Sequence, residues 1–214
     1  MSDLTGLQKL VDSGHVDPEV FLLRPDFAVD LLNATAVDQL PHVAAWREAY
    51  RSFGAKPQRT RNGLEALIRR AATGLPRINR LTDIYNAVSV FHQIPLGGEE
   101  IASYVGAPRL IRATGNEPFD TATGGAGTVE YPEPGEVVRS DDVGVTCRRW
   151  NWRQRRRTQN RDDTSTALFI LDALEPMSDD DLQCAADVLS AHLKQLGPNV
   201  RIARRLISSE RSAS

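Results

Sequence analysis

The chain of 214 residues has little of what extracellular, metal-binding or membrane-spanning proteins need. Its two cysteines, Cys147 and Cys184, are too few for a disulfide framework or a cysteine-only metal site. Its four histidines show no metal-ligand spacing. No stretch approaches the ~18 apolar residues of a transmembrane helix, and the start, MSDLTGLQKL, does not have the pattern of a signal peptide. We therefore expect a cytoplasmic protein with no metal, no cofactor and no membrane partner.

Net charge and aromatic content are also low. The 26 basic and 28 acidic residues nearly cancel, which excludes a uniformly basic nucleic-acid binder but leaves room for a local basic patch. Hydrophobic residues make up 41% of the chain and charged residues 25%, as in ordinary globular proteins, so wholesale disorder is excluded. Aromatic residues make up only 6%, and two of the three tryptophans stand close together.

Helical patterns occur before and after a strand-rich middle. We expect helices from His42 to Phe53, after the capping residue Asn62, across Leu81 to Val88, and after the capping residue Ser178. The alternating segment 18–33 predicts a strand. We expect one domain over residues 18–198, preceded by an extension over residues 1–17 and followed by a flexible tail over residues 199–214.

The middle of the chain is typical of antiparallel strands separated by glycine- and proline-rich loops such as 122–135. The predicted strands are Arg109–Thr114, Glu136–Ser140, Val145–Trp150 and Thr166–Asp172. Residues 141–144 predict a hairpin turn, and residues 96–98 a turn or a close backbone approach. This order predicts an α+β fold, with a central mixed or antiparallel sheet flanked by helices.

The segment from Arg148 to Arg161 is the most unusual. It holds seven arginines, no acid, and both Trp150 and Trp152. Guanidinium groups bind phosphates and an indole ring stacks on bases, so the pattern predicts a nucleic-acid surface. The alternative is a solvated strand edge whose tryptophans belong to the core. In a continuous strand the two tryptophans would share one face, and Arg149 and Arg153 the other.

Two further motifs have both a functional and a structural interpretation. The glycines of Leu96-Gly97-Gly98-Glu99-Glu100 would let the backbone lie against a ligand, with a glutamate positioning water; the alternative is a solvated acidic turn. Cys147 stands beside an arginine that would lower its pKa, but no Cys–His spacing supports a cysteine nucleophile.

Several segments together resemble the free-standing B3/B4 domain proteins, relatives of the editing module in the β subunit of phenylalanyl-tRNA synthetase. These segments are YRSFGAKP (50–57), GLPRINRLTDIYNAVSVFHQI (74–94), PLGGEE (95–100), GEVVRS (135–140) and DDVGVTCRRWNWRQRRRTQNRDDTST (141–166). The resemblance spans roughly residues 20–175. In the synthetase this module hydrolyses tRNA charged with the wrong amino acid. The resemblance therefore implies an aminoacyl-tRNA substrate, attacked by water at the ester on the terminal ribose.

The resemblance also implies where the pocket lies. The synthetase's pocket asparagine and proline fall on Asn86 and Pro95, and its small-residue wall falls near residues 149–151. Its loop histidine falls on Gly97, and its tyrosine-reading glutamate falls on Ile170, or on Asp172 if the alignment shifts. Most groups that recognise tyrosine are thus absent, so we expect a different specificity, for an aliphatic or small amino acid.

We therefore expect an aminoacyl-tRNA deacylase acting in trans, with the acceptor end and the amino-acid moiety of the substrate as its partners. A non-catalytic tRNA or amino-acid binding module is the first alternative, and a scaffold protein the second. The substrate's ribose hydroxyl can assist a positioned water, so no protein nucleophile is required. The residues expected to position water are Gly97, Gly98 and Glu99. Those expected to bind substrate are Asn86, Pro95, Arg149, Trp150, Asn151, Trp152, Arg153 and Gln154, and those expected to bind tRNA are Arg148, Arg155, Arg156 and Arg157.

Overall fold

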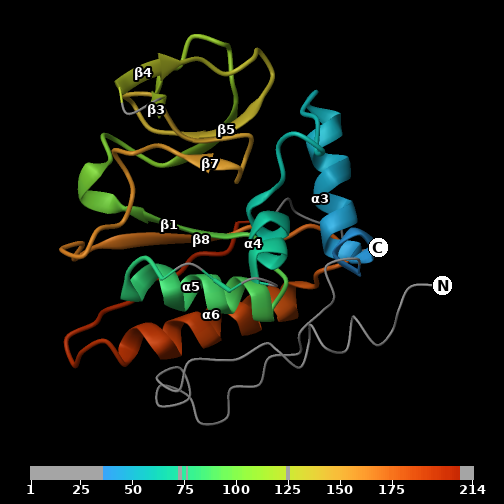
Figure 1. The fold of residues 1–214 in the computed structure, drawn as a ribbon. Coiled ribbons are helices and arrows are strands. Elements are labelled where there is room, and N and C mark those ends of the chain that lie inside the picture. The colour runs from blue at the N-terminus through green and yellow to red at the C-terminus, as the bar shows by residue number, and fades with distance from the viewer. Residues whose placement is uncertain (1–35, 72–73, 76, 124–125, 208–214) are drawn as a thin grey trace.

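A computed structural model of the chain describes residues 36–71, 74–75, 77–123 and 126–207 (Figure 1). The extension expected over residues 1–17 and the strand expected over residues 18–33 lie outside the described residues, as does the end of the expected tail.

The described residues contain four α-helices. These are α3 (Pro41–Ser52), α4 (Gly63–Ala71), α5 (Arg80–Phe91) and α6 (Asp179–Lys194), with 3-10 turns at η1 (Ala36–Gln39) and η2 (Ile101–Ser103). Asn62 Oδ1 accepts a hydrogen bond from the Glu65 amide at 2.9 Å, and Ser178 Oγ accepts one from the Asp181 amide at 3.1 Å. Both bonds satisfy amides that a helix start leaves free. All four predicted helices are confirmed.

The strands among the described residues form three antiparallel sheets. A two-stranded sheet pairs β1 (Leu96–Glu100) with β8 (Ala167–Leu171). A four-stranded sheet has the order β2 (Arg109–Arg112), β5 (Val137–Ser140), β6 (Val145–Arg148) and β7 (Arg153–Gln154). A hairpin pairs β3 (Phe119–Thr123) with β4 (Ala126–Glu130). The α+β class is confirmed, with the strands divided among three sheets in place of one central sheet.

Strand β1 replaces the turn that we expected at residues 96–98. Gly98 stands opposite Phe169 in the register with β8. Glycine has low strand propensity, so the local pattern does not indicate a strand here; pairing with the apolar strand 71 positions later determines it. The β3–β4 hairpin likewise occupies part of the expected loop 122–135.

Strand β6 ends at Arg148, before the two tryptophans. Arg149 and Trp150 have φ values of 46° and 65°, in the left-handed region that L residues rarely adopt. The chain therefore turns at residues 149–152, and the alternation expected for a continuous strand does not occur. The hairpin turn at residues 141–144 is confirmed, because the Asp141 amide donates to the Gly144 carbonyl at 3.0 Å.

The elements stack in layers. In Figure 1, α5 and α6 cover one face of the β1–β8 sheet, the other sheets lie beyond its opposite face, and α3 and α4 stand at one side. Val88 of α5 and Leu189 of α6 form an apolar cluster to which Phe169 of β8 adds its ring. Phe119, Val138 and Val145 form a second cluster beneath the four-stranded sheet. This arrangement brings α4, α5 and the turn after β6 together.

Candidate functional site

A cavity of about 540 Å³ lies between α4, α5 and the turn after β6. Asn86 and Trp152, two of the residues expected to bind substrate, both line it although 66 positions separate them. Ala66, Leu67, Ile78 and Tyr85 give the cavity an apolar wall. Arg59, Arg61, Arg69 and Arg70 line it as well. The cavity thus combines an apolar wall, one amide, one indole ring and four positive charges.

Asn86 lies in the middle of α5, one helical turn after Thr82 and on the same face. Asn79 caps the start of this helix by accepting a hydrogen bond from the Thr82 amide at 2.8 Å. Asn86 is 9% exposed, and no group in the part of the chain that the structure describes hydrogen-bonds its side-chain amide. A nearly buried amide with a free donor and a free acceptor is available to a ligand.

Two guanidinium groups contact the Trp152 ring. The Arg149 group lies 4.5 Å from the ring centroid and the Arg153 group 4.8 Å, distances typical of cation–π contacts. The backbone of the preceding turn is fixed, because the Arg149 amide donates to Glu136 Oε1 at 3.0 Å and the Trp150 amide to the Val137 carbonyl at 2.6 Å. These contacts hold the indole ring in place at the cavity.

The other residues of the turn face the protein. Trp150 is half-buried and packs edge-on against the core residue Trp46, with ring centroids 5.2 Å apart. The Asn151 amide nitrogen donates to Asp172 Oδ2 at 3.2 Å, and its oxygen accepts from Tyr50. Trp150 therefore fits the structural interpretation, whereas Trp152 lines the cavity.

Residues 45–196 match the family described as the B3/4 domain. This chain belongs to the B3/4 domain family. It is the family of the editing domain of the phenylalanyl-tRNA synthetase β subunit, so the resemblance seen in the sequence is confirmed. The match covers the whole cavity, from Arg59 to Trp152. Searches of curated proteins and of solved structures gave no match.

The arginine run of this B3/4 domain is not a continuous basic surface. Arg148 and Arg155 are both 5% exposed, and Arg157 is half-buried. Arg148 binds both carboxylate oxygens of Glu136, at 2.6 and 2.8 Å. Arg155 pairs with Asp120, and Arg157 pairs with Asp141 at 2.6 Å.

The burial and the ion pairs of these side chains count against the expectation that Arg148, Arg155 and Arg157 contact tRNA phosphates. The run is free of acids only along the sequence, and the fold brings acids to it from β3, the end of the 131–136 loop and the hairpin turn. Arg148 and Arg155 are buried, and each has the carboxylate partner that a buried charge needs. Arg156 is exposed and remains available to a ligand.

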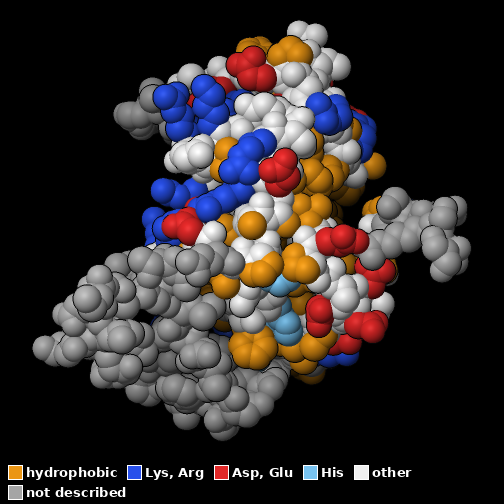
Figure 2. Space-filling model, turned by 90° about the vertical axis from the view of Figure 1, so that its right-hand side faces the viewer, with side chains coloured by type: hydrophobic (Ala, Val, Ile, Leu, Met, Phe, Trp, Pro, Cys, Tyr) orange, Lys and Arg blue, Asp and Glu red, His pale blue; other side chains and the backbone are white. Residues whose placement is uncertain are grey.

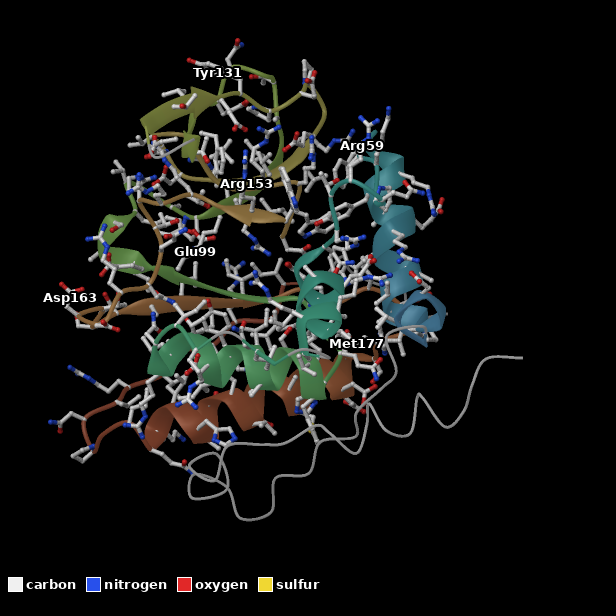
Figure 3. All side chains as sticks on the ribbon, viewed as in Figure 1. Arg59, Glu99, Tyr131, Arg153, Asp163 and Met177 are labelled. Carbon is white, nitrogen blue, oxygen red and sulfur yellow. The ribbon has the colours of Figure 1, made fainter. Side chains whose placement is uncertain are left out.

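Gly97, Gly98 and Glu99 lie on β1, between the layers, and they are not among the described residues that line the cavity (Figure 3). A β-carbon on Gly98 would lie 2.8 Å from Tyr85 Cε1, so the close approach that we expected here is to a protein side chain. Glu99 is buried and accepts a hydrogen bond from the Tyr104 hydroxyl at 2.6 Å.

Two other expected site residues have structural contacts. Gln154 donates to the Gly98 carbonyl at 3.1 Å and to the Thr158 carbonyl at 2.9 Å, which ties β7 to β1. Pro95 is buried, and its carbonyl accepts from the Asp172 amide at 3.0 Å.

Within the described part of the chain, the other chemical groups give no sign of a nucleophile or a metal site. Burial raises the pKa of the Cys147 thiol to about 12, and the nearby Glu99 carboxylate adds to that shift, so the thiol is protonated at neutral pH. Burial lowers the pKa of His92, which packs against Phe91. The described residues include no cluster of three His, Cys, Asp or Glu side chains that could hold a metal ion. None of the described helices is both long and apolar enough to cross a bilayer.

Sequence reasoning missed the four arginines at the cavity. They occur in Gln58-Arg59-Thr60-Arg61, just before α4, and in Ile68-Arg69-Arg70, in its last turn. Glu65 lies between the two pairs, so neither resembles a basic run. The detectable signal is the spacing of Glu65 and Arg69, which places both on one face of α4, with Arg61 four positions before Glu65.

Proposed function

We propose that this B3/4 domain is an aminoacyl-tRNA deacylase that acts in trans on mischarged tRNA, with its reaction site in the cavity of Asn86 and Trp152. One observation carries the proposal: a single cavity combines an unpaired amide, an indole ring, an apolar wall and several arginines. An aminoacylated tRNA end presents the matching groups, namely an ester, a base, an amino-acid side chain and phosphates.

Each part of the cavity has a role in this proposal. The exposed part of the half-buried Trp152 ring contacts the terminal base, since base–aromatic contacts tolerate any base. Leu67 and Ile78 contact the amino-acid side chain. Their apolar character supports an aliphatic or small amino acid over tyrosine, because burying an unpaired hydroxyl is costly. The arginines bind phosphates.

The chemistry is hydrolysis of an ester without a protein nucleophile. Water adds to the carbonyl carbon, the bond from that carbon to the ribose oxygen breaks, and a proton of the water passes to the ribose oxygen. The products are a free amino acid and a tRNA with a free hydroxyl. The Asn86 amide donates to the oxyanion that develops on the carbonyl oxygen, and the neighbouring ribose hydroxyl assists the water. In this proposal the role first expected of Gly97, Gly98 and Glu99 belongs to Asn86.

A non-catalytic binding module with the same fold is the second candidate. The observation that favours it is that the described residues lining the cavity include no Asp, Glu or His that would serve as a general base. Such a module would hold the tRNA end or an amino acid without hydrolysis.

Incubation with a panel of tRNAs charged with different amino acids distinguishes the candidates. Release of free amino acid above the spontaneous rate supports the deacylase. Retention of charged tRNA on the protein without release supports the binding module. If the protein neither releases the amino acid nor retains the charged tRNA, both candidates are contradicted.

A further inference from the structure

A second, smaller cavity of about 240 Å³ adjoins the first. Arg47, Arg51, Arg61 and Arg69 line it together with Asp38 and Glu65. Arg61 and Arg69 also line the larger cavity. The two cavities therefore share two guanidinium groups, which lie between α3 and α4.

Glu65 lies at the centre of a cluster formed by Arg47, Arg61 and Arg69. Its side chain is 2% exposed, and Arg47 binds both of its oxygens, at 3.0 and 2.6 Å. Arg69 donates to the same carboxylate at 3.1 Å, and Arg61 lies 3.5 Å from it. Three arginines thus surround one buried acid. Bidentate and charge-assisted bonds of this kind fix the guanidinium groups in place before any ligand arrives.

Positive charge exceeds negative charge around the two cavities. They are lined by six different arginines, and by only the two acids Asp38 and Glu65. Arg51 is 52% exposed and pairs with the exposed Glu48, while the Arg59 side chain has no ion pair with any residue that the structure describes. Each guanidinium carries five N–H donors, so many donors remain for an anionic ligand.

The surface view agrees with this excess. Figure 2 looks at the molecule from the side of α3, and basic side chains gather in the upper half of that face, while acidic ones lie mostly at its lower right. Two adjoining positive cavities with shared walls suit a polyanion that passes from one to the other better than a single small anion.

We propose that the arginines lining the two cavities around Glu65 bind the phosphodiester backbone of the RNA whose 3′ end occupies the larger cavity. This inference rests on the proposed function, and it assigns the tRNA phosphates to α3 and α4 in place of the 155–157 run. Phosphate oxygens match the planar fork of an arginine, and Glu65 supplies the preorganised geometry.

The test measures binding of uncharged tRNA to the full chain by fluorescence anisotropy at several salt concentrations. The test variant combines Arg51→Ala, Arg59→Ala and Arg61→Ala, which leaves Glu65 paired with Arg47 and Arg69. A charge-matched control combines Arg109→Ala, Arg112→Ala and Arg161→Ala. Arg109 and Arg112 lie on the edge strand β2, and Arg161 lies two positions before Asp163. Figure 3 shows Asp163 on the opposite side of the molecule from Arg59.

We expect the test variant to bind at least tenfold more weakly in about 0.1 M salt. The slope of its log affinity against log salt concentration should become less negative by about 0.7 to 0.9 for each phosphate that the variant no longer binds. The control should keep both the affinity and the slope of the wild type, and thermal melts should show that all three proteins are folded.

An unchanged affinity and slope in the folded test variant would overturn the phosphate assignment, as would an equal loss in the control. Inorganic phosphate and a mononucleotide are then tested as competitors of tRNA binding. If either displaces tRNA only at concentrations far above that of the tRNA, an extended RNA ligand is supported. If either displaces tRNA at a concentration equal to that of the tRNA, an extended RNA ligand is contradicted. Amino-acid release measured on the same proteins separates the two proposals. Absence of release by the wild type counts against the proposed deacylase alone.

Discussion

The Tyr50 hydroxyl donates a hydrogen bond to Oδ1 of Asn151 over 2.8 Å, although 101 positions separate the two residues. Burial raises the pKa of Tyr50, so its hydroxyl is protonated and acts as the donor. Asp172 accepts from the other side of the same amide and pairs with Arg139. The bond joins α3 to the turn that presents Trp152 to the cavity.

Removing the Tyr50 hydroxyl should destabilise the fold. Tyr50→Phe leaves the half-buried Asn151 oxygen without this partner, which costs about 0.5 to 1.5 kcal/mol. Tyr131→Phe is the matched control, because Tyr131 is 56% exposed. Urea unfolding of the two variants measures the difference; equal stabilities would show that the bond contributes nothing.

The buried pair of Arg148 and Glu136 should matter for stability in the same way. Arg148→Ala leaves the Glu136 carboxylate buried without its main partner, with an expected loss of about 3 to 5 kcal/mol. Arg156→Ala, on an exposed side chain of the same run, should change the free energy of unfolding by less than about 0.5 kcal/mol. Two variants of equal stability would restore the interpretation of the run as a surface.

Gly98 should tolerate no side chain, whereas Gly97 should tolerate one. A β-carbon at Gly98 would lie 2.6 Å from Asn160 Nδ2 and 2.8 Å from Tyr85 Cε1, and at Gly97 it would meet nothing within 4 Å. Gly98→Val should lower stability by about 1 to 3 kcal/mol through overpacking, and it should displace Tyr85 from the cavity wall. Gly97→Ala should melt like the wild type. Thermal unfolding compares them, and a Gly98→Val variant with an unchanged Tm contradicts the packing described.

The two thiols should differ in reactivity. Cys147 is buried, with a pKa raised to about 12, and Cys184 is exposed. At pH 8 a thiol-specific reagent should label one cysteine per folded chain and two after unfolding, because attack requires the thiolate. Cys147→Ser should leave any amino-acid release within about twofold of the wild type. A loss of two decades in a folded variant would assign the thiol a catalytic role.

Local signals predicted the helices well, and contacts between distant segments decided the rest. Asn62 and Ser178 predicted the starts of their helices, because a capping side chain binds a backbone amide only three residues further along the chain. Nothing near Gly98 indicated strand β1, whose partner Phe169 comes 71 positions later.

The residues of the candidate site were likewise predictable only in part. Asn86 and Trp152 were found through the family resemblance and the basic segment, and the fold brings them together. The pairing of Arg155 with Asp120 and of Arg148 with Glu136 could not be predicted, since charge along a sequence does not show which acids the fold supplies. The arginines before and within α4 were missed because Glu65 separates the two pairs along the sequence.

The most direct test is the single-turnover release of an aliphatic amino acid from its charged tRNA by the wild type and by Asn86→Ala. Because the described residues make no hydrogen bond to the Asn86 side chain, Asn86→Ala should keep the wild-type Tm. Loss of an oxyanion donor should slow release by about 100-fold or more, while Asn116→Ala, at an exposed position, should match the wild type. A folded Asn86→Ala variant that releases the amino acid at the wild-type rate would contradict hydrolysis in this cavity.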